Sequence, residues 1–231
     1  MFYIDKIRLF GIFAILLLNF PLAWAQSDMD YLWEGKLSVS KKLDSKWSMQ
    51  GSALVEQNTG WGSSEFTVIQ KLETGISADR KLLNGSKLGG GFVYVGYDLF
   101  RPEVNNEYRL RQQFSFSFSL QKYRIGNRFR TEQRMYDDKY RNRWRYRLSV
   151  DFPLKGAELN AKEPYLIVSD EVLYNFNAWN QEVENRSSVG FGWQMEGGAK
   201  AQLALQYRLS KIGLNNQSQS IYLSTAIYFS L

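Results

Sequence analysis

Hydrophobic and polar residues alternate along most of the chain after residue 30, and the alternation is clearest between residues 108 and 122. One face of this segment carries Tyr108, Leu110, Phe114, Phe116, Phe118 and Leu120. The other face carries Arg109, Arg111, Gln113, Ser115, Ser117, Ser119 and Gln121. Side chains point to opposite faces at successive positions of a strand, so this pattern predicts a β-strand with one apolar and one polar face.

The next two segments repeat this pattern with a charged polar face. In residues 123–135 the polar face carries Arg124, Arg128, Arg130, Glu132 and Arg134. In residues 141–152 it carries Arg141, Arg143, Arg145 and Arg147, and the apolar face carries Trp144, Tyr146, Leu148, Val150 and Phe152. We therefore expect two neighbouring strands whose apolar faces lie on one side and whose arginines lie on the other.

Weaker alternation predicts eight more strands, at about residues 31–40, 47–56, 66–76, 87–99, 165–176, 183–196, 199–210 and 220–231. Most of the predicted strands have about ten or more residues, whereas strands of soluble proteins average about five or six. Strands that cross a membrane at a tilt need about nine to eleven residues. The pattern therefore predicts an all-β fold, an antiparallel up-and-down transmembrane β-barrel. The segment from Gly89 to Leu99 is apolar on both faces, so its orientation stays open.

The strand number needs a further argument, because bacterial barrels contain an even number of strands. We expect about twelve strands, with ten as the other possibility, and the stretch Pro153–Pro164 is where a weakly patterned strand would be missed. The alternative fold is a lipocalin-like soluble barrel or a β-sandwich, in which the apolar faces would point inward.

The first 25 residues have the order of a secretory signal peptide. Lys6 and Arg8 precede an apolar run from Leu9 to Leu18, and Ala23 and Ala25 supply the small residues of a cleavage site. The run is about ten residues long, and a spanning helix needs about twenty. We expect cleavage after Ala25, a single barrel domain over residues 26–231, and export to the outer membrane of a Gram-negative bacterium.

The composition excludes several chemistries. The chain has no cysteine and no histidine, which removes disulfides, thiolate or imidazole metal ligands, and Ser-His catalysis. The families of outer-membrane phospholipases, lipid A deacylases and barrel proteases rely on a histidine for catalysis, so this chain cannot work as they do. We therefore expect no enzymatic activity, no cofactor and no metal site.

If the apolar faces contact lipid, the charged faces line the lumen. A hairpin that turns through Tyr136–Lys139 pairs Arg134 with Arg141, Glu132 with Arg143, Arg130 with Arg145 and Arg128 with Arg147. Like charges opposite each other are destabilising, so carboxylates must come from other strands. The carboxylates of suitable parity are Glu34, Glu56, Glu73, Glu171, Glu184 and Glu196. The expected lumen network comprises Arg109, Arg111, Arg128, Arg130, Glu132, Arg134, Arg141, Arg143, Arg145, Arg147 and Glu171.

Two functions of this network remain open. The ion pairs fill and rigidify a sealed barrel, or the surplus of arginine over carboxylate lines a narrow path for a small anionic solute. A membrane enzyme that uses Glu132 or Glu171 is the rival from another class. The expected partners are outer-membrane lipids, the barrel assembly machinery through the C-terminal strand, and a small anionic solute, with no role for nucleic acid.

The arginine strands also carry a resemblance. The run Arg130-Thr-Glu-Gln-Arg134, then Arg143-Trp-Arg-Tyr-Arg147, then Glu171 in a strand that ends at Asn175, resembles a family of predicted outer-membrane proteins known only as a domain of unknown function. The resemblance covers most of the chain after residue 25. It implies a barrel and no established activity.

Overall fold

The computed structural model describes residues 29–59, 69–97, 106–156 and 162–231. These residues form eleven strands and one 3-10 turn: β1 (Met29–Lys42), β2 (Trp47–Asn58), β3 (Ile69–Lys81), β4 (Lys87–Tyr97), β5 (Glu107–Leu120), β6 (Tyr123–Tyr136), β7 (Tyr140–Pro153), β8 (Pro164–Phe176), β9 (Gln181–Gln194), η1 (Glu196–Gly198), β10 (Lys200–Ser210) and β11 (Ser218–Ser230). Among them no helix is long and apolar enough to span a bilayer. The predicted signal peptide lies outside the described residues.

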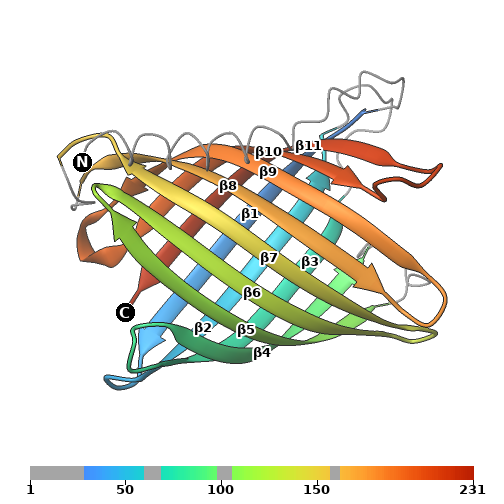
Figure 1. The fold of residues 1–231 in the computed structure, drawn as a ribbon, viewed down its shortest axis with the longest axis horizontal. Coiled ribbons are helices and arrows are strands. Elements are labelled where there is room, and N and C mark those ends of the chain that lie inside the picture. The colour runs from blue at the N-terminus through green and yellow to red at the C-terminus, as the bar shows by residue number, and fades with distance from the viewer. Residues whose placement is uncertain (1–28, 60–68, 98–105, 157–161) are drawn as a thin grey trace.

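The strands form one closed barrel, and each strand pairs with the strands before and after it in sequence (Figure 1). All sequential pairs are antiparallel, so the predicted up-and-down architecture is confirmed. Closure removes the unpaired strand edges that an open sheet would expose.

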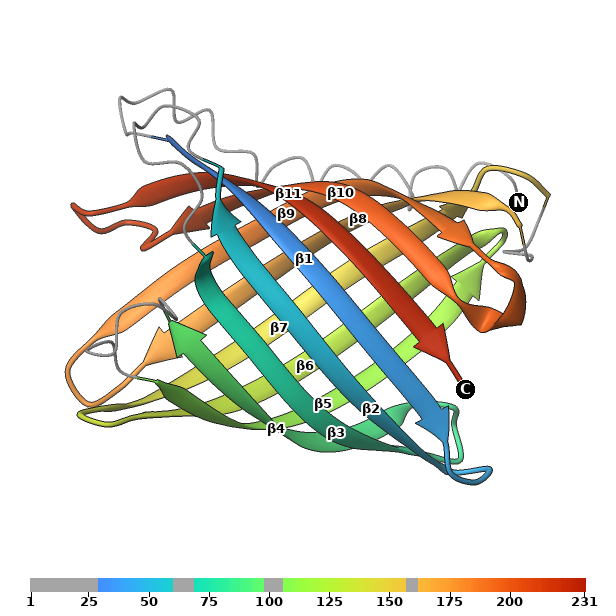
Figure 2. The ribbon, with the colours of Figure 1, turned by 180° about the vertical axis from the view of Figure 1, so that it is seen from behind.

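The barrel closes through a parallel pair. β1 lies beside β11 from Met29↔Gln219 to Ser40↔Ser230, and the blue and red strands run side by side in Figure 2. An odd number of alternating strands leaves the first and last strands pointing the same way, so the seam must be parallel. The expectation of twelve strands is therefore corrected to eleven in the described residues. No strand of the wall lies between β7 and β8, because the two pair directly as far as Pro153↔Tyr165, and residues 157–161 of the stretch Pro153–Pro164 lie outside the described residues.

The two faces of each strand differ as the alternation predicts. Large apolar side chains on the outside are exposed, among them Leu110, Phe129, Trp144, Phe191 and Leu205. Charged side chains on the inside are enclosed, among them Glu107, Arg109, Glu132, Arg143 and Glu171. This distribution is the reverse of a water-soluble barrel, where the apolar residues fill the interior.

The glycines of β4 explain the segment whose orientation the alternation leaves open. Val93, Val95 and Tyr97 point inward, in line with Gly89 and Gly91. A Cβ at Gly89 would lie 1.8 Å from Oδ1 of Asp79, and one at Gly91 would lie 2.6 Å from Cβ of Ser77. The glycines therefore make room for inward side chains of the neighbouring β3.

A tyrosine packs over a glycine on the other side of the barrel. Tyr165 of β8 is buried against Gly192 of β9, and its hydroxyl accepts a hydrogen bond from Nε2 of Gln202 at 2.7 Å. A Cβ at Gly192 would lie 2.1 Å from Cζ of this ring. Only glycine lets the ring lie flat against the wall.

We expect Gly192→Ala to lower the free energy of unfolding by about 1–3 kcal/mol, because the ring must leave its place. Urea unfolding of the refolded barrel in lipid measures this change. Gly51→Ala is the matched control, since a Cβ there meets nothing within 4 Å. Equal stabilities of the two variants would show that the Tyr165 ring is free to move.

Candidate functional site: the charged lumen

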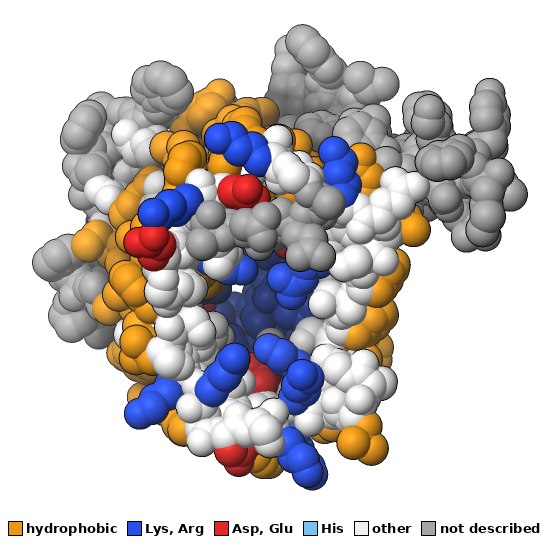
Figure 3. Space-filling model, turned by 90° about the vertical axis from the view of Figure 1, so that its left-hand side faces the viewer, with side chains coloured by type: hydrophobic (Ala, Val, Ile, Leu, Met, Phe, Trp, Pro, Cys, Tyr) orange, Lys and Arg blue, Asp and Glu red, His pale blue; other side chains and the backbone are white. Residues whose placement is uncertain are grey.

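The inward side chains surround a cavity of about 750 Å³. Figure 3 looks into the end of the barrel at which β1 and β11 finish and shows a hollow lined by lysine and arginine, with apolar side chains on the outer flanks. Fourteen of the described lining residues are lysine or arginine and seven are glutamate or aspartate. Glu107 and Glu132 lie behind this lining, so cations outnumber carboxylates even when both are included.

The β6–β7 hairpin has the register that a turn at Tyr136–Lys139 predicts. Arg134 lies opposite Arg141, Glu132 opposite Arg143, Arg130 opposite Arg145, and Arg128 opposite Arg147. Three of these four pairs bring two guanidinium groups together. The repulsion between them requires carboxylates within the same layer of the lumen.

Glu132 is the main carboxylate within this hairpin. Its side chain is 3% exposed and accepts hydrogen bonds from Nε of Arg143 at 2.7 Å and Nη1 of Arg145 at 3.1 Å, with Nη1 of Arg130 at 3.8 Å. The second amino nitrogen of Arg143 also contacts Glu132. One carboxylate therefore holds three arginines from two strands.

Glu171 of β8 is the second carboxylate beside the hairpin. Arg145 donates to both of its oxygens, from Nη2 at 2.8 Å and from Nε at 3.2 Å, and Arg128 donates from Nη2 at 3.2 Å. A planar guanidinium binds a carboxylate in this forked way better than a lysine does. Arg145 thus links Glu132 and Glu171 across two strand interfaces.

A third cluster centres on Glu107, which is 0% exposed. It accepts hydrogen bonds from Arg109 at 2.5 Å and from the hydroxyl of Tyr97 at 2.6 Å, and it also contacts Arg134. Glu107 was not among the predicted inward carboxylates. Its parity with Arg109, two residues later, was the signal that could have identified it.

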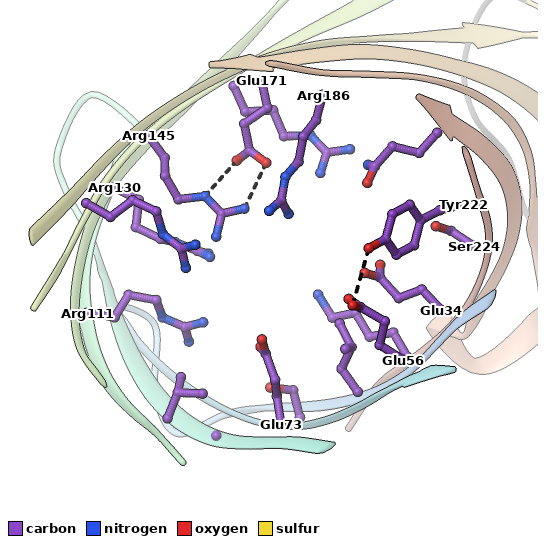
Figure 4. A pocket seen from close by; sticks show the side chains of 18 of the residues that line it. Glu34, Glu56, Glu73, Arg111, Arg130, Arg145, Glu171, Arg186, Tyr222 and Ser224 are labelled. Carbon is purple, nitrogen blue, oxygen red and sulfur yellow. Dashed lines mark hydrogen bonds and ion pairs between the residues drawn. The ribbon is translucent and has the colours of Figure 1, made fainter. Parts of the chain in front are cut away.

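The opposite wall carries glutamates. Arg208 donates to Glu34 at 2.6 Å, Lys71 to Glu56 at 2.6 Å, and Arg109 to Glu73 at 2.9 Å. Arg208 lies over the ring of Tyr222, and the Tyr222 hydroxyl donates to Glu56 at 3.2 Å. Figure 4 shows these glutamates facing Arg111, Arg130 and Arg145 across open space.

Five cations that line the cavity lack a carboxylate partner among the described residues. These cations are Arg111 of β5, Arg147 of β7, Lys36 of β1, Lys87 of β4, and Lys211, which follows β10. Nε of Arg111 and Nε of Arg130 also have no hydrogen-bond partner. Eight of the ten arginines that line the cavity lie on β5, β6 and β7, so the arginine charge is concentrated on this wall.

Most of the remaining predicted residues lie inside the lumen. Glu184 pairs with Arg186 at 2.6 Å, and Arg141 pairs with Glu182 at 3.5 Å. Glu196 is wrong as an inward carboxylate, because it lies in the exposed turn η1 and pairs with Lys162. Arg186 and Arg208 were missed, although Arg186 has the parity of Glu184, two residues earlier, which was the signal that could have identified it. In the described segments no group of three or more acidic side chains is arranged to hold a metal ion.

The geometry defines a closed β-barrel with a charged, partly open lumen. A family comparison then identifies the chain more narrowly: the profile of the protein family of unknown function DUF2490 matches residues 32–219. The chain belongs to this family, and the match covers most of the barrel. Comparison with curated proteins and with solved structures gave no match.

Proposed function

We propose that this protein is an outer-membrane β-barrel whose lumen admits small anions in preference to cations. The observation that carries the proposal is the distribution of side chains: large apolar groups are exposed around the outside, and rows of guanidinium groups are enclosed within. A continuous apolar outer surface is unfavourable in water and favourable in a bilayer. A bilayer also requires the charged side chains to be kept away from the lipid, inside the barrel.

Strand length supports the membrane setting. The strands contain 11 to 14 residues, and a tilted strand needs about nine to eleven to cross the hydrocarbon layer. Export would follow from the predicted signal peptide of residues 1–25. The partners would be outer-membrane lipids around the wall and the barrel assembly machinery at the C-terminal strand, whose outward Leu223, Ile227 and Phe229 are exposed.

The charge of the lumen supports selectivity for anions. Barrels of about eight strands are filled by side chains, whereas those of about sixteen leave an aqueous channel. Eleven strands lie between these limits, and a cavity remains between the arginine and glutamate walls. Unpaired cations along a pore lower the barrier to anions and raise it to cations.

The proposal gives the carboxylates no catalytic role. Glu132 and Glu171 each accept hydrogen bonds from two arginines, so their carboxylate oxygens are already engaged by the wall. The dense ion pairs around Glu107, Glu132 and Glu171 also favour a second reading, a sealed barrel in which the network serves stability alone.

Planar bilayers distinguish the two readings. We expect the purified barrel in a potassium chloride gradient to give a small conductance whose reversal potential favours chloride. The double variant Arg111→Gln/Arg147→Gln should shift the reversal potential toward zero, because two cations without ion pairs are removed while the network stays intact. Lys162→Gln, on an exposed turn, is the control. The absence of any conductance at all salt concentrations would contradict the proposed passage and favour the sealed barrel.

A further inference from the structure

The lumen has opposite charge on two facing walls. On β5, β6 and β7 the cavity is lined by Arg109, Arg111, Arg128, Arg130, Arg134, Arg143, Arg145 and Arg147. On β1, β2 and β3 it is lined by four carboxylates and two lysines, and Glu34, Glu56 and Glu73 lie on one side of the opening. A solute in this cross-section therefore experiences a field across the barrel as well as along it.

The arginine wall has unused donors. Arg111 lines the cavity and forms no ion pair or side-chain hydrogen bond in the described part of the chain, so its terminal nitrogens have no protein acceptor there. Arg130 donates from Nη2 to Gln113 at 2.9 Å, and its Nη1 lies 3.8 Å from Glu132, beyond hydrogen-bond distance. Two guanidinium groups on one wall whose terminal nitrogens are not fully used form a favourable place for a carboxylate.

The glutamate wall has unused acceptors. Arg208 binds Oε2 of Glu34, and Arg109 and Lys71 bind Oε1 of Glu73. Within the described residues, no hydrogen bond reaches Oε1 of Glu34 or Oε2 of Glu73. Both side chains keep part of their surface exposed to the cavity, at 17% and 21%. An ammonium group in the cavity would find an acceptor at either glutamate, beside the ammonium of Lys71, which lies 2.6 Å from Glu56 and 3.5 Å from Glu73.

We infer that the lumen binds a small zwitterionic organic anion of the acidic amino-acid type, with its carboxylates toward Arg111 and Arg130 and its ammonium toward Glu34 and Glu73. The net negative charge of such a solute suits the surplus of cations, and its ammonium group suits the opposite wall. A cavity of about 750 Å³ is large enough for it, since pockets for small molecules measure about 300–1,000 Å³. The inference rests on the proposed function and names its solute class.

A comparison of L-glutamate with glutarate tests the inference, because the two differ by the ammonium group alone. Binding to the detergent-solubilised barrel is measured by titration calorimetry, which needs no conduction. We expect L-glutamate to bind about tenfold more tightly than glutarate, the size of one charge-assisted hydrogen bond. Equal affinity, tighter binding of glutarate, or no binding of either would overturn the inference.

Two variants locate the ammonium. Glu73→Gln and Glu34→Gln keep the size of the side chain and should each reduce the ratio of affinities toward one. Glu182→Gln is the matched control, because it removes a cavity-lining carboxylate on β9, away from this wall, and should leave the ratio unchanged. Heat-modified gel mobility checks that each variant is folded. An unchanged ratio in both wall variants would also contradict the inference.

The outcomes separate this inference from the proposed function. If the barrel conducts chloride in preference to potassium but binds L-glutamate and glutarate equally, the inferred binding site is contradicted and the proposed anion selectivity is supported. If the barrel binds L-glutamate selectively but shows no conductance in planar bilayers, the binding site is supported and the proposed passage of anions is contradicted.

Discussion

Phe129→Arg is expected to prevent the barrel from assembling stably in a bilayer. Phe129 lies on the outer face in the middle of β6, is 48% exposed, and packs its ring 4.7 Å from that of Tyr146. An arginine on the lipid face near the midplane costs about 2–4 kcal/mol. Loss of the aromatic pair adds about 1 kcal/mol. Together these are a large part of the stability of a domain.

Urea unfolding in lipid vesicles and the yield of heat-modifiable protein measure this effect. Ser52→Arg is the control, because Ser52 lines the lumen between Ser38 and Gly75, where the same side chain reaches water and carboxylates. If Phe129→Arg folded as well as the unchanged protein, the outer face would be in contact with water and the membrane setting would be wrong.

Glu132→Gln is the second variant with a large expected effect. Glu132 is the carboxylate that binds Arg143 and Arg145 and lies near Arg130, and its removal leaves these cations crowded in an enclosed layer. Breaking a buried ion pair by removing one partner costs roughly 3–5 kcal/mol. We expect a loss of this size in the free energy of unfolding and a loosened barrel in the gel-shift assay.

Two comparisons separate the specific effect of removing Glu132 from the effect of removing any carboxylate in the lumen. Glu182→Gln removes a more exposed carboxylate whose pair with Arg141 is 3.5 Å long, and should cost less than about 1 kcal/mol. The double variant Glu132→Gln/Arg143→Gln should recover part of the loss, because one uncompensated cation is removed with the anion. A Glu132→Gln loss no greater than that of Glu182→Gln would mean that the arginines find other partners.

The wall of the barrel and its inward rows of charge follow from the local pattern of the sequence. Alternation with period two fixes which side chains share a face, and a short turn at Tyr136–Lys139 fixes the register of β6 and β7. These two features are sufficient to predict that Arg130 lies opposite Arg145. Strands with a charged face, such as β5, β6 and β7, were therefore the most predictable part of the molecule.

Contacts between distant strands were not predictable in the same way. Arg208 of β10 binds Glu34 of β1 because the barrel closes through the β1–β11 seam, and alternation within a strand carries no information about closure. The even strand number expected of bacterial barrels led to twelve, whereas the parallel seam permits eleven. Glu196 has inward parity in sequence, but the strand ends at Gln194, before this residue.

The environment of alternate residues in one strand tests the orientation of the two faces most directly. The chain has no cysteine, so each of the single variants Leu203→Cys, Ala204→Cys, Leu205→Cys and Gln206→Cys in β10 can carry one fluorophore. Leu203 and Leu205 are exposed on the outside, while Ala204 and Gln206 line the cavity.

In reconstituted vesicles we expect spin-labelled lipid to quench the probes at Leu203 and Leu205, and iodide to quench those at Ala204 and Gln206. Iodide quenching at Leu203 and Leu205, with no effect of the spin-labelled lipid, would contradict the membrane-spanning barrel, because the apolar faces would then lie in water.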